Sequence, residues 1–191
     1  MTGITSAAQN RAATGGIQAG VKTTLLAAGA AAAVLLSGAP AHAATAAIPD
    51  FKAPKIFGTT FQPDPGHDFT KGIHSRRNGI LRGWITSVTG ATAEYTPIKW
   101  QKDKYAEGHF VGPAEGDVMA YASPVARRVV FLSAFGCKPS MAGMTVDRKT
   151  GLGAKRCTRA DLIKRVKQVK RPALITVYKG QIVKFQEIYT P

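Results

Sequence analysis

The clearest pattern of apolar and polar positions lies at the C-terminal end of the chain, in residues 158–191. Apolar side chains recur at helical spacing between 159 and 170, and basic side chains occupy the opposite face. Thr158 and Asp161 have the spacing of an N-terminal capping box, and Pro172 disfavours helical geometry in the residue before it. The pattern therefore predicts an amphipathic helix over residues 159–170.

Two β-branched, apolar segments follow this helix and predict a hairpin. Residues 173–178 are apolar on both faces, which is typical of a central strand, and residues 181–189 are more polar. The Lys-Gly pair between them predicts a two-residue turn, because glycine adopts positive φ at little cost. This turn places Leu174 opposite Phe185 in the predicted register.

Similar segments earlier in the chain predict further strands at 80–88, 92–101, 117–122 and 128–133. Pro97 predicts that part of the second segment lies at a sheet edge or in a bulge, because proline cannot donate a backbone hydrogen bond. The order of elements predicts a β-rich α+β fold built on a small antiparallel barrel. It matches a five-stranded OB barrel if the last two of these segments supply mainly one barrel strand and a side hairpin. OB barrels bind oligosaccharides or oligonucleotides, which is an analogy of fold alone.

The first 43 residues have the layout of a secretory signal peptide. Arg11 and Lys22 supply a positive start, and an apolar run of suitable length follows. A small-x-small triplet that ends at Ala43 predicts cleavage there and a secreted protein. An uncleaved anchor is the alternative, although the apolar run is short for a membrane span.

The rest of the chain divides into two parts by composition. Residues 44–78 are rich in proline and lack periodicity, which predicts a mobile arm, partly docked by its phenylalanines. Residues 79–191 predict a single β-rich domain, since a mature chain of this length can bury one core.

The two cysteines, Cys137 and Cys157, both lie in this domain. In an oxidising exterior such a pair predicts a disulfide. The bond would close a loop of about 21 residues and contribute on the order of 3 kcal/mol in the chain-entropy model. A catalytic cysteine or a metal site is the alternative, but no histidine lies nearby in the sequence.

Charge is the strongest feature that the fold does not explain. The chain has 26 Lys and Arg against 11 Asp and Glu, a net charge of +15. The leader removes two basic residues, which leaves +13, and residues 148–171 alone hold ten basic residues and one acidic residue. A field of this sign concentrates anions. The predicted binding residues are Arg148, Lys149, Lys155, Arg156, Arg159, Lys164, Lys167 and Arg171.

This charge predicts a non-enzymatic binding protein for an anionic partner outside the cell. The partner would be a phosphate-bearing cell-wall polymer, an acidic lipid surface or nucleic acid. One alternative is a solvated face that only keeps the protein soluble. Another is a secreted inhibitor or protein-interaction domain that uses the loop closed by the cysteines.

Candidate catalytic and metal-binding residues are few. The chain contains no nucleophile elbow, phosphate-binding loop, zinc-protease motif or EF-hand loop. His67, Asp68 and His74 form the one cluster of candidate metal ligands, at a spacing that fits no standard site. A small hydrolase built on His67, His74 and Glu187 is the remaining alternative. The sequence predicts no cofactor.

The domain also resembles a group of small secreted proteins and lipoproteins of actinobacteria. The shared patterns are a Gly-x-Ile/Val-x-x-Val strand, a strand that ends near a tryptophan, a Tyr-x-x-Pro turn and an Arg-x-Val-x-Leu strand. A helix and a last strand of the form Thr-Val-x-x-Gly-x-Ile/Val-x-x-x-x-Glu-x-Tyr-x-Pro follow. The resemblance covers residues 79–191 and implies a secreted β-rich domain without assigning a function. The residues that carry the last pattern are Thr176, Val177, Gly180, Ile182, Glu187, Tyr189 and Pro191.

Overall fold

The computed structural model describes residues 47–138 and 143–190, so the predicted signal peptide lies outside the described residues. The regular elements are a short 3-10 helix, η1, one α-helix and eight strands. Their bounds are η1 Phe69–Lys71, β1 Gly79–Thr89, β2 Thr92–Pro97, β3 Lys99–Gln101, β4 His109–Val111, β5 Tyr121–Ser133, β6 Lys155–Cys157, α1 Arg159–Gln168, β7 Ala173–Tyr178 and β8 Gln181–Glu187.

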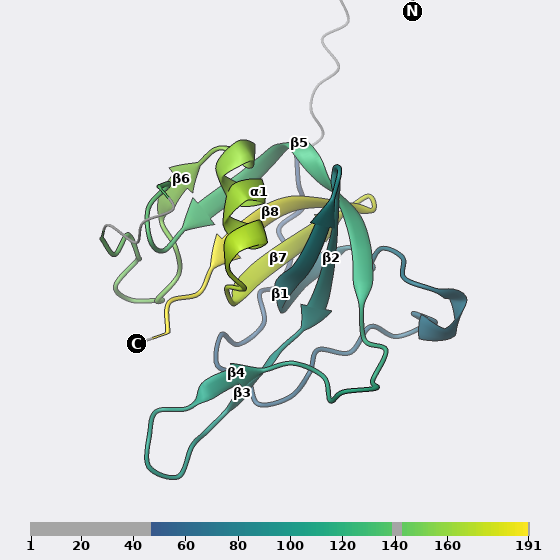
Figure 1. Ribbon diagram of the computed structural model, residues 1–191, viewed down its shortest axis with the longest axis horizontal. Helices are drawn as coiled ribbons and strands as arrows, with labels where there is room; N and C mark the ends of the chain where they lie inside the picture. Colours follow the sequence, from purple (N-terminus) through teal and green to yellow (C-terminus); the bar gives the residue numbers. More distant parts are fainter. Residues whose placement is uncertain (1–46, 139–142, 191) are drawn as a thin grey trace, which may run out of the picture. The chain divides into compact units, whose positions relative to one another are not determined.

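Five strands form a closed barrel. Neighbouring strands follow the order β2-β1-β7-β8-β5, and β2 also pairs with β5, which closes the sheet (Figure 1). The β5–β8 pair is parallel and the other pairs are antiparallel. The helix α1 lies between the third and fourth barrel strands, as it does in an OB barrel. The predicted β-rich α+β fold with a small, OB-like barrel is confirmed.

The barrel encloses the hydrophobic core. Alternate positions of each strand point inward because side chains in a strand have a period of two. The helix adds Leu162 and Val166 to this core, so its apolar face is buried as predicted. The largest apolar side chains with almost no exposure are Tyr95, Tyr121, Phe131, Phe185, Leu81, Ile85 and Ile175.

The strands predicted at 117–122 and 128–133 belong to one strand, β5, which begins only at Tyr121. The strand continues through Pro124, which lies opposite Thr92 at the end of the pairing with β2. Proline has no N–H to donate, but the next N–H, of Val125, donates to Ala91 O at 2.8 Å. The break predicted between the two segments, at 123–127, is therefore wrong. Instead of turning, the strand bulges between Val125 and Val130 in its pairing with β8.

The last hairpin has the predicted turn but a different register. Lys179 and Gly180 both have positive φ, 49° and 73°, which fits a two-residue hairpin turn. The pairing shifts by one residue after the first pairs, so Ile175, not Leu174, lies opposite Phe185. A bulge at Val183 produces this shift, and sequence patterning gave no sign of it.

Three other boundaries differ from the prediction. The segment predicted as one strand at 92–101 is divided into β2 and β3, and β3 pairs with β4 in a separate two-stranded sheet. Figure 1 shows this hairpin projecting from the barrel. The helix ends at Gln168, because Val169 already has an extended backbone. The final strand ends at Glu187.

In the described part of the chain, no helix is long and apolar enough to cross a bilayer.

The described part of the proline-rich arm, 47–78, lies against the barrel. Arg82 on β1 is only 2% exposed, and its guanidinium donates hydrogen bonds to the backbone oxygens of Lys55, Thr60 and Ile98. The side chain of Gln62 donates to Ile80 O and accepts from the backbone N–H of Arg82. A buried guanidinium thus helps to hold this segment, which the sequence predicted to be a mobile arm partly docked by its phenylalanines.

Candidate functional site

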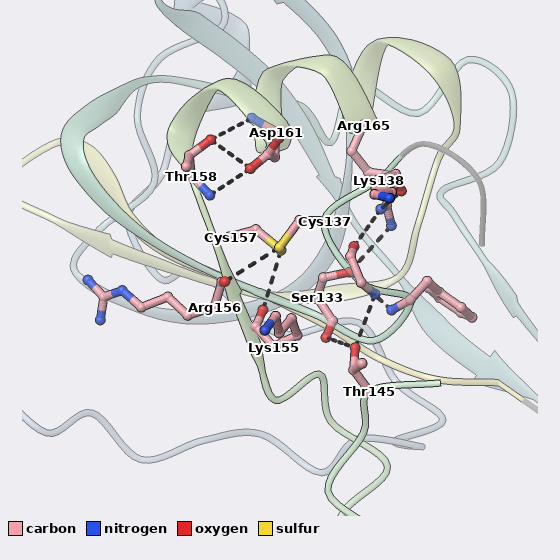
Figure 2. The surroundings of a disulfide bond; sticks show 12 residues. Ser133, Cys137, Lys138, Thr145, Lys155, Arg156, Cys157, Thr158, Asp161 and Arg165 are labelled. Atoms are coloured by element: carbon pink, nitrogen blue, oxygen red, sulfur yellow. Dashed lines mark hydrogen bonds between the residues drawn. A yellow bond between two sulfur atoms is a disulfide. The ribbon is translucent and has the colours of Figure 1, made fainter. Parts of the chain in front are cut away.

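The disulfide predicted between Cys137 and Cys157 is present. The two Cα atoms lie 5.4 Å apart. The bond joins the loop after β5 to the end of β6, immediately before α1 (Figure 2). It therefore fixes β6, an edge strand of only three residues, beside the start of the helix.

The helix begins with the capping box that its sequence predicts. The Thr158 side chain accepts a hydrogen bond from Asp161 N, and the Asp161 carboxylate accepts bonds from Thr158 N and Oγ1 at 2.9 and 2.7 Å. The hydrogen bonds from the Thr158 side chain and backbone lower the pKa of Asp161. This carboxylate therefore caps the N-terminus of the helix.

An open cavity of about 560 Å³ lies beside the disulfide. Its three arginines come from three different elements: Arg127 from the bulge of β5, Arg156 from β6 and Arg159 from α1. Val129 and the disulfide supply apolar surface between them. We refer to this cavity as the arginine pocket.

The arginines of this pocket form no ion pairs with carboxylates of the described residues. Arg159 donates from Nε and Nη2 to Val125 O, at 3.3 Å in both cases, which directs one edge of its guanidinium to the backbone. Arg127 and Arg156 are exposed, and neither forms an ion pair with a carboxylate of the described residues. Asp161, which also lines the pocket, is held by Thr158.

The eight predicted binding residues do not form one continuous cluster. Arg156 and Arg159 line the arginine pocket, whereas Lys155 is exposed on β6. The helix exposes Lys164 and Lys167 further along. Three residues lie elsewhere: Arg148 and Lys149 are in a turn whose amides bond to Asp147, and Arg171, beyond the end of α1, packs on the Phe135 ring.

The most buried basic residue of the segment has a structural role. Arg165 is 4% exposed, and its Nη1 lies 3.1 Å from Oε1 of Glu187, which is fully buried. Its Nη2 donates to the backbone oxygens of Gly136 and Lys138, in the loop that carries Cys137. Glu187 also accepts from Ser133 Oγ and Ala134 N. The network ties the helix, β8 and the cysteine loop together, and it engages the carboxylate considered for a hydrolase.

The candidate metal ligands do not converge on a common point. The rings of His67 and His74 stack at 4.0 Å and 17°, so their nitrogen lone pairs lie in two nearly parallel planes. Asp68 instead caps η1 by accepting from Thr70 N and Oγ1. Within the part of the chain that the structure describes, no three His, Cys, Asp or Glu side chains could hold a metal ion.

His67 has an environment that favours its neutral form. Its side chain is 2% exposed, and its ring contacts Phe69 and Tyr121 as well as His74. Burial, followed by the nearby charge of His74, lowers the pKa of His67, although Asp64 and Asp68 oppose this effect. Burial also raises the pKa of Tyr121 to about 12, which keeps its phenol neutral.

We expect the stability of the domain to fall as the pH decreases from 6.5 toward 5. Because the folded-state pKa of His67 lies below its unfolded value, the unfolded chain binds this proton first, and folding is penalised in that window. Urea unfolding at pH 7 and pH 5 measures the loss, and His67→Gln should reduce it. Equal losses in both proteins would show that another group is responsible. The hydrogen-bonded Asp68, Asp147 and Asp161, whose pKa values are lowered, titrate below this window.

Sequence reasoning missed Arg127. It concentrated on the basic run 148–171, and Arg127 lies more than twenty positions before that run. The available signal was the pair Arg127-Arg128, two successive polar positions that interrupt the alternation of a half-buried strand.

Comparison of the chain with protein-family models, with curated proteins and with solved structures gives no match. The resemblance to actinobacterial secreted proteins therefore stays a prediction.

Proposed function

We propose that this protein is a secreted, non-enzymatic binding module for an anionic extracellular polymer or surface, and that the arginine pocket is its main contact. The observation that carries the proposal is the convergence of Arg127, Arg156 and Arg159 from three elements on one cavity. A guanidinium matches the geometry of phosphate and carboxylate groups, because it presents several N–H donors in a fixed plane.

The surroundings of the pocket support the same role. Lys155 on β6 and Lys164 and Lys167 on α1 add exposed positive charge to two of the elements that form the pocket. The disulfide and the buried Arg165–Glu187 pair hold β6, the cysteine loop and the helix in place. A pre-arranged set of cations binds an anion with a smaller entropic cost than flexible side chains do.

Replacing both exposed arginines should weaken binding strongly. We expect Arg127→Gln/Arg156→Gln to lower the affinity for fluorescent polyphosphate by roughly 10- to 30-fold, since each basic residue near an anionic surface contributes about 1 kcal/mol. Fluorescence anisotropy at low salt measures the change. Vesicles with acidic headgroups and an acidic polysaccharide, tested in parallel, distinguish a lipid surface from a polymer.

The matched control removes the same charge from another place. Arg148→Gln/Lys149→Gln changes two exposed basic residues that do not line the pocket. We expect this control to lower the affinity by less than about threefold, through the long-range field alone. Equal losses in the two variants would mean that net charge, and not the pocket, determines binding.

A further inference from the structure

A second open groove, of about 390 Å³, lies between β1, the β3–β4 hairpin and the segment that follows α1. Trp84 from β1 and Phe110 from β4 supply aromatic surface, and Lys170 and Pro172 line the other side. His109 also lines the groove and bonds through Nδ1 to Asp103 at 3.0 Å. We refer to this as the tryptophan groove.

Both aromatic side chains are held in place by their neighbours. A Cβ added at Gly112 would lie 3.2 Å from Cζ2 of Trp84, so the glycine allows the backbone to pack against the indole. Phe110 packs edge-on against Trp100 at 4.9 Å and stacks with Phe57 at 6.0 Å. Trp84 remains half-buried, so part of its surface is accessible. A rigid, partly accessible aromatic surface is typical of a ligand site.

We infer that the tryptophan groove binds a sugar ring of an anionic polysaccharide. The C–H face of a sugar ring is apolar and packs on the electron-rich face of an indole, while its hydroxyl groups accept from nearby donors. Lys170 is exposed and forms no ion pair with the described carboxylates, so it complements an acidic substituent on that sugar.

This inference rests on the function proposed above, which supplies the anionic character of the polymer. The tryptophan groove would be a second contact for the same polymer. The arginine pocket adjoins Thr158 and Arg159 at the start of α1, and the tryptophan groove adjoins Lys170 just beyond its end. The ten residues of the helix span about 15 Å, with Lys164 and Lys167 exposed between the two sites. A separation of this order is within the length of one linear polyanion.

The distribution of aromatic side chains favours a glycan over a single-stranded nucleic acid. Nucleic-acid strands stack successive bases on a series of aromatic side chains. Trp84 and Phe110 both line the groove, but the outward positions next to Trp84 on β1 and β2 hold Thr86, Glu94 and Thr96, which do not extend this surface into a series. The groove thus offers one short aromatic surface beside Lys170, which suits a single acidic sugar unit.

The test compares three anionic polymers that differ in their rings. Polyphosphate has none, alginate has carboxylate-bearing sugar rings, and oligo-dT has bases. We expect Trp84→Leu to lower the affinity for alginate by about tenfold and to leave the affinity for polyphosphate unchanged. The control Tyr105→Ala removes a 90% exposed aromatic side chain on the same hairpin, outside the groove, and should change neither.

The parent protein provides a second measurement that does not depend on a variant. The chain has two tryptophans, so its NMR spectrum has two indole N–H signals. Alginate oligomers should shift the signal of Trp84 and leave that of Trp100, which is 8% exposed. An unmoved Trp84 signal, or a larger effect of Trp84→Leu on oligo-dT than on alginate, would overturn the inference.

The two proposals can fail separately. If alginate affinity falls in Arg127→Gln/Arg156→Gln but not in Trp84→Leu, the groove is excluded and the arginine pocket remains. If it falls only in Trp84→Leu, the groove is supported and the arginine pocket is excluded as the main contact.

Discussion

Arg165→Met should lower the free energy of unfolding by about 3–5 kcal/mol. The substitution leaves the Glu187 carboxylate fully buried, with only Ser133 Oγ and Ala134 N as donors. It also removes both hydrogen bonds that Arg165 makes to the cysteine loop. Removing one partner of a buried ion pair costs more than the pair itself contributes, because an uncompensated charge remains in the interior. Urea unfolding with a constant m-value measures the loss.

A double substitution separates this charge effect from lost packing. Arg165→Met/Glu187→Leu removes both charges, so it should cost clearly less than the sum of the two single substitutions. Some loss remains, because Ser133 and Ala134 no longer have their acceptor. Single substitutions that each cost under about 1 kcal/mol would contradict a stabilising role for the network.

Cys137→Ser/Cys157→Ser should lower the free energy of unfolding by about 3 kcal/mol. The two cysteines are separated by 20 positions, and removing a cross-link of this span increases the conformational freedom of the unfolded chain by about that amount. Polyphosphate affinity should fall as well, because both cysteines line the arginine pocket and the bond holds β6 beside α1. Urea unfolding and fluorescence anisotropy of the variant measure the two effects.

Reduction of the parent protein is the matched control for this variant. A reducing agent should produce the same loss of stability and affinity in the parent and no further change in the variant. Unchanged stability after complete reduction, verified by thiol titration, would show that packing of β6 and the Arg165 network alone maintain this region.

The sequence was most informative where structure is determined locally. The helix was predicted from the capping residues Thr158 and Asp161 and from one apolar face, and all these signals lie within a few turns. The Lys179-Gly180 turn was predicted for the same reason. The disulfide followed from the number of cysteines and the predicted compartment.

Features that depend on pairing between distant segments were not predictable in this way. Pro124 lies in the gap between two predicted strands, and β5 tolerates it because of its place opposite Thr92, in a strand about thirty positions earlier. The strand β6 has only three residues and exists through its pairing with β5. Arg127 joins the pocket because β5 bulges against β8. None of these contacts produces a periodic pattern of apolar residues in the sequence.

The basic run was only a partial guide to the candidate site. Arg165 and Lys164 are adjacent in the sequence and have equal charge, yet one is buried against Glu187 and the other is exposed on the helix. The difference depends on which helix face meets β8 and on a carboxylate more than twenty positions away. Charge counting therefore predicted the kind of partner proposed here, but it could not place the pocket.

The salt dependence of polyphosphate binding tests the central claim most directly. The parent and Arg127→Gln/Arg156→Gln are compared by plotting the logarithm of affinity against the logarithm of salt concentration. If both arginines contact the anion, the slope of the variant should be shallower by roughly 1.5, because binding without these two contacts releases fewer counterions from the polyanion. Parallel lines with equal affinities would show that the arginine pocket does not bind the polyanion.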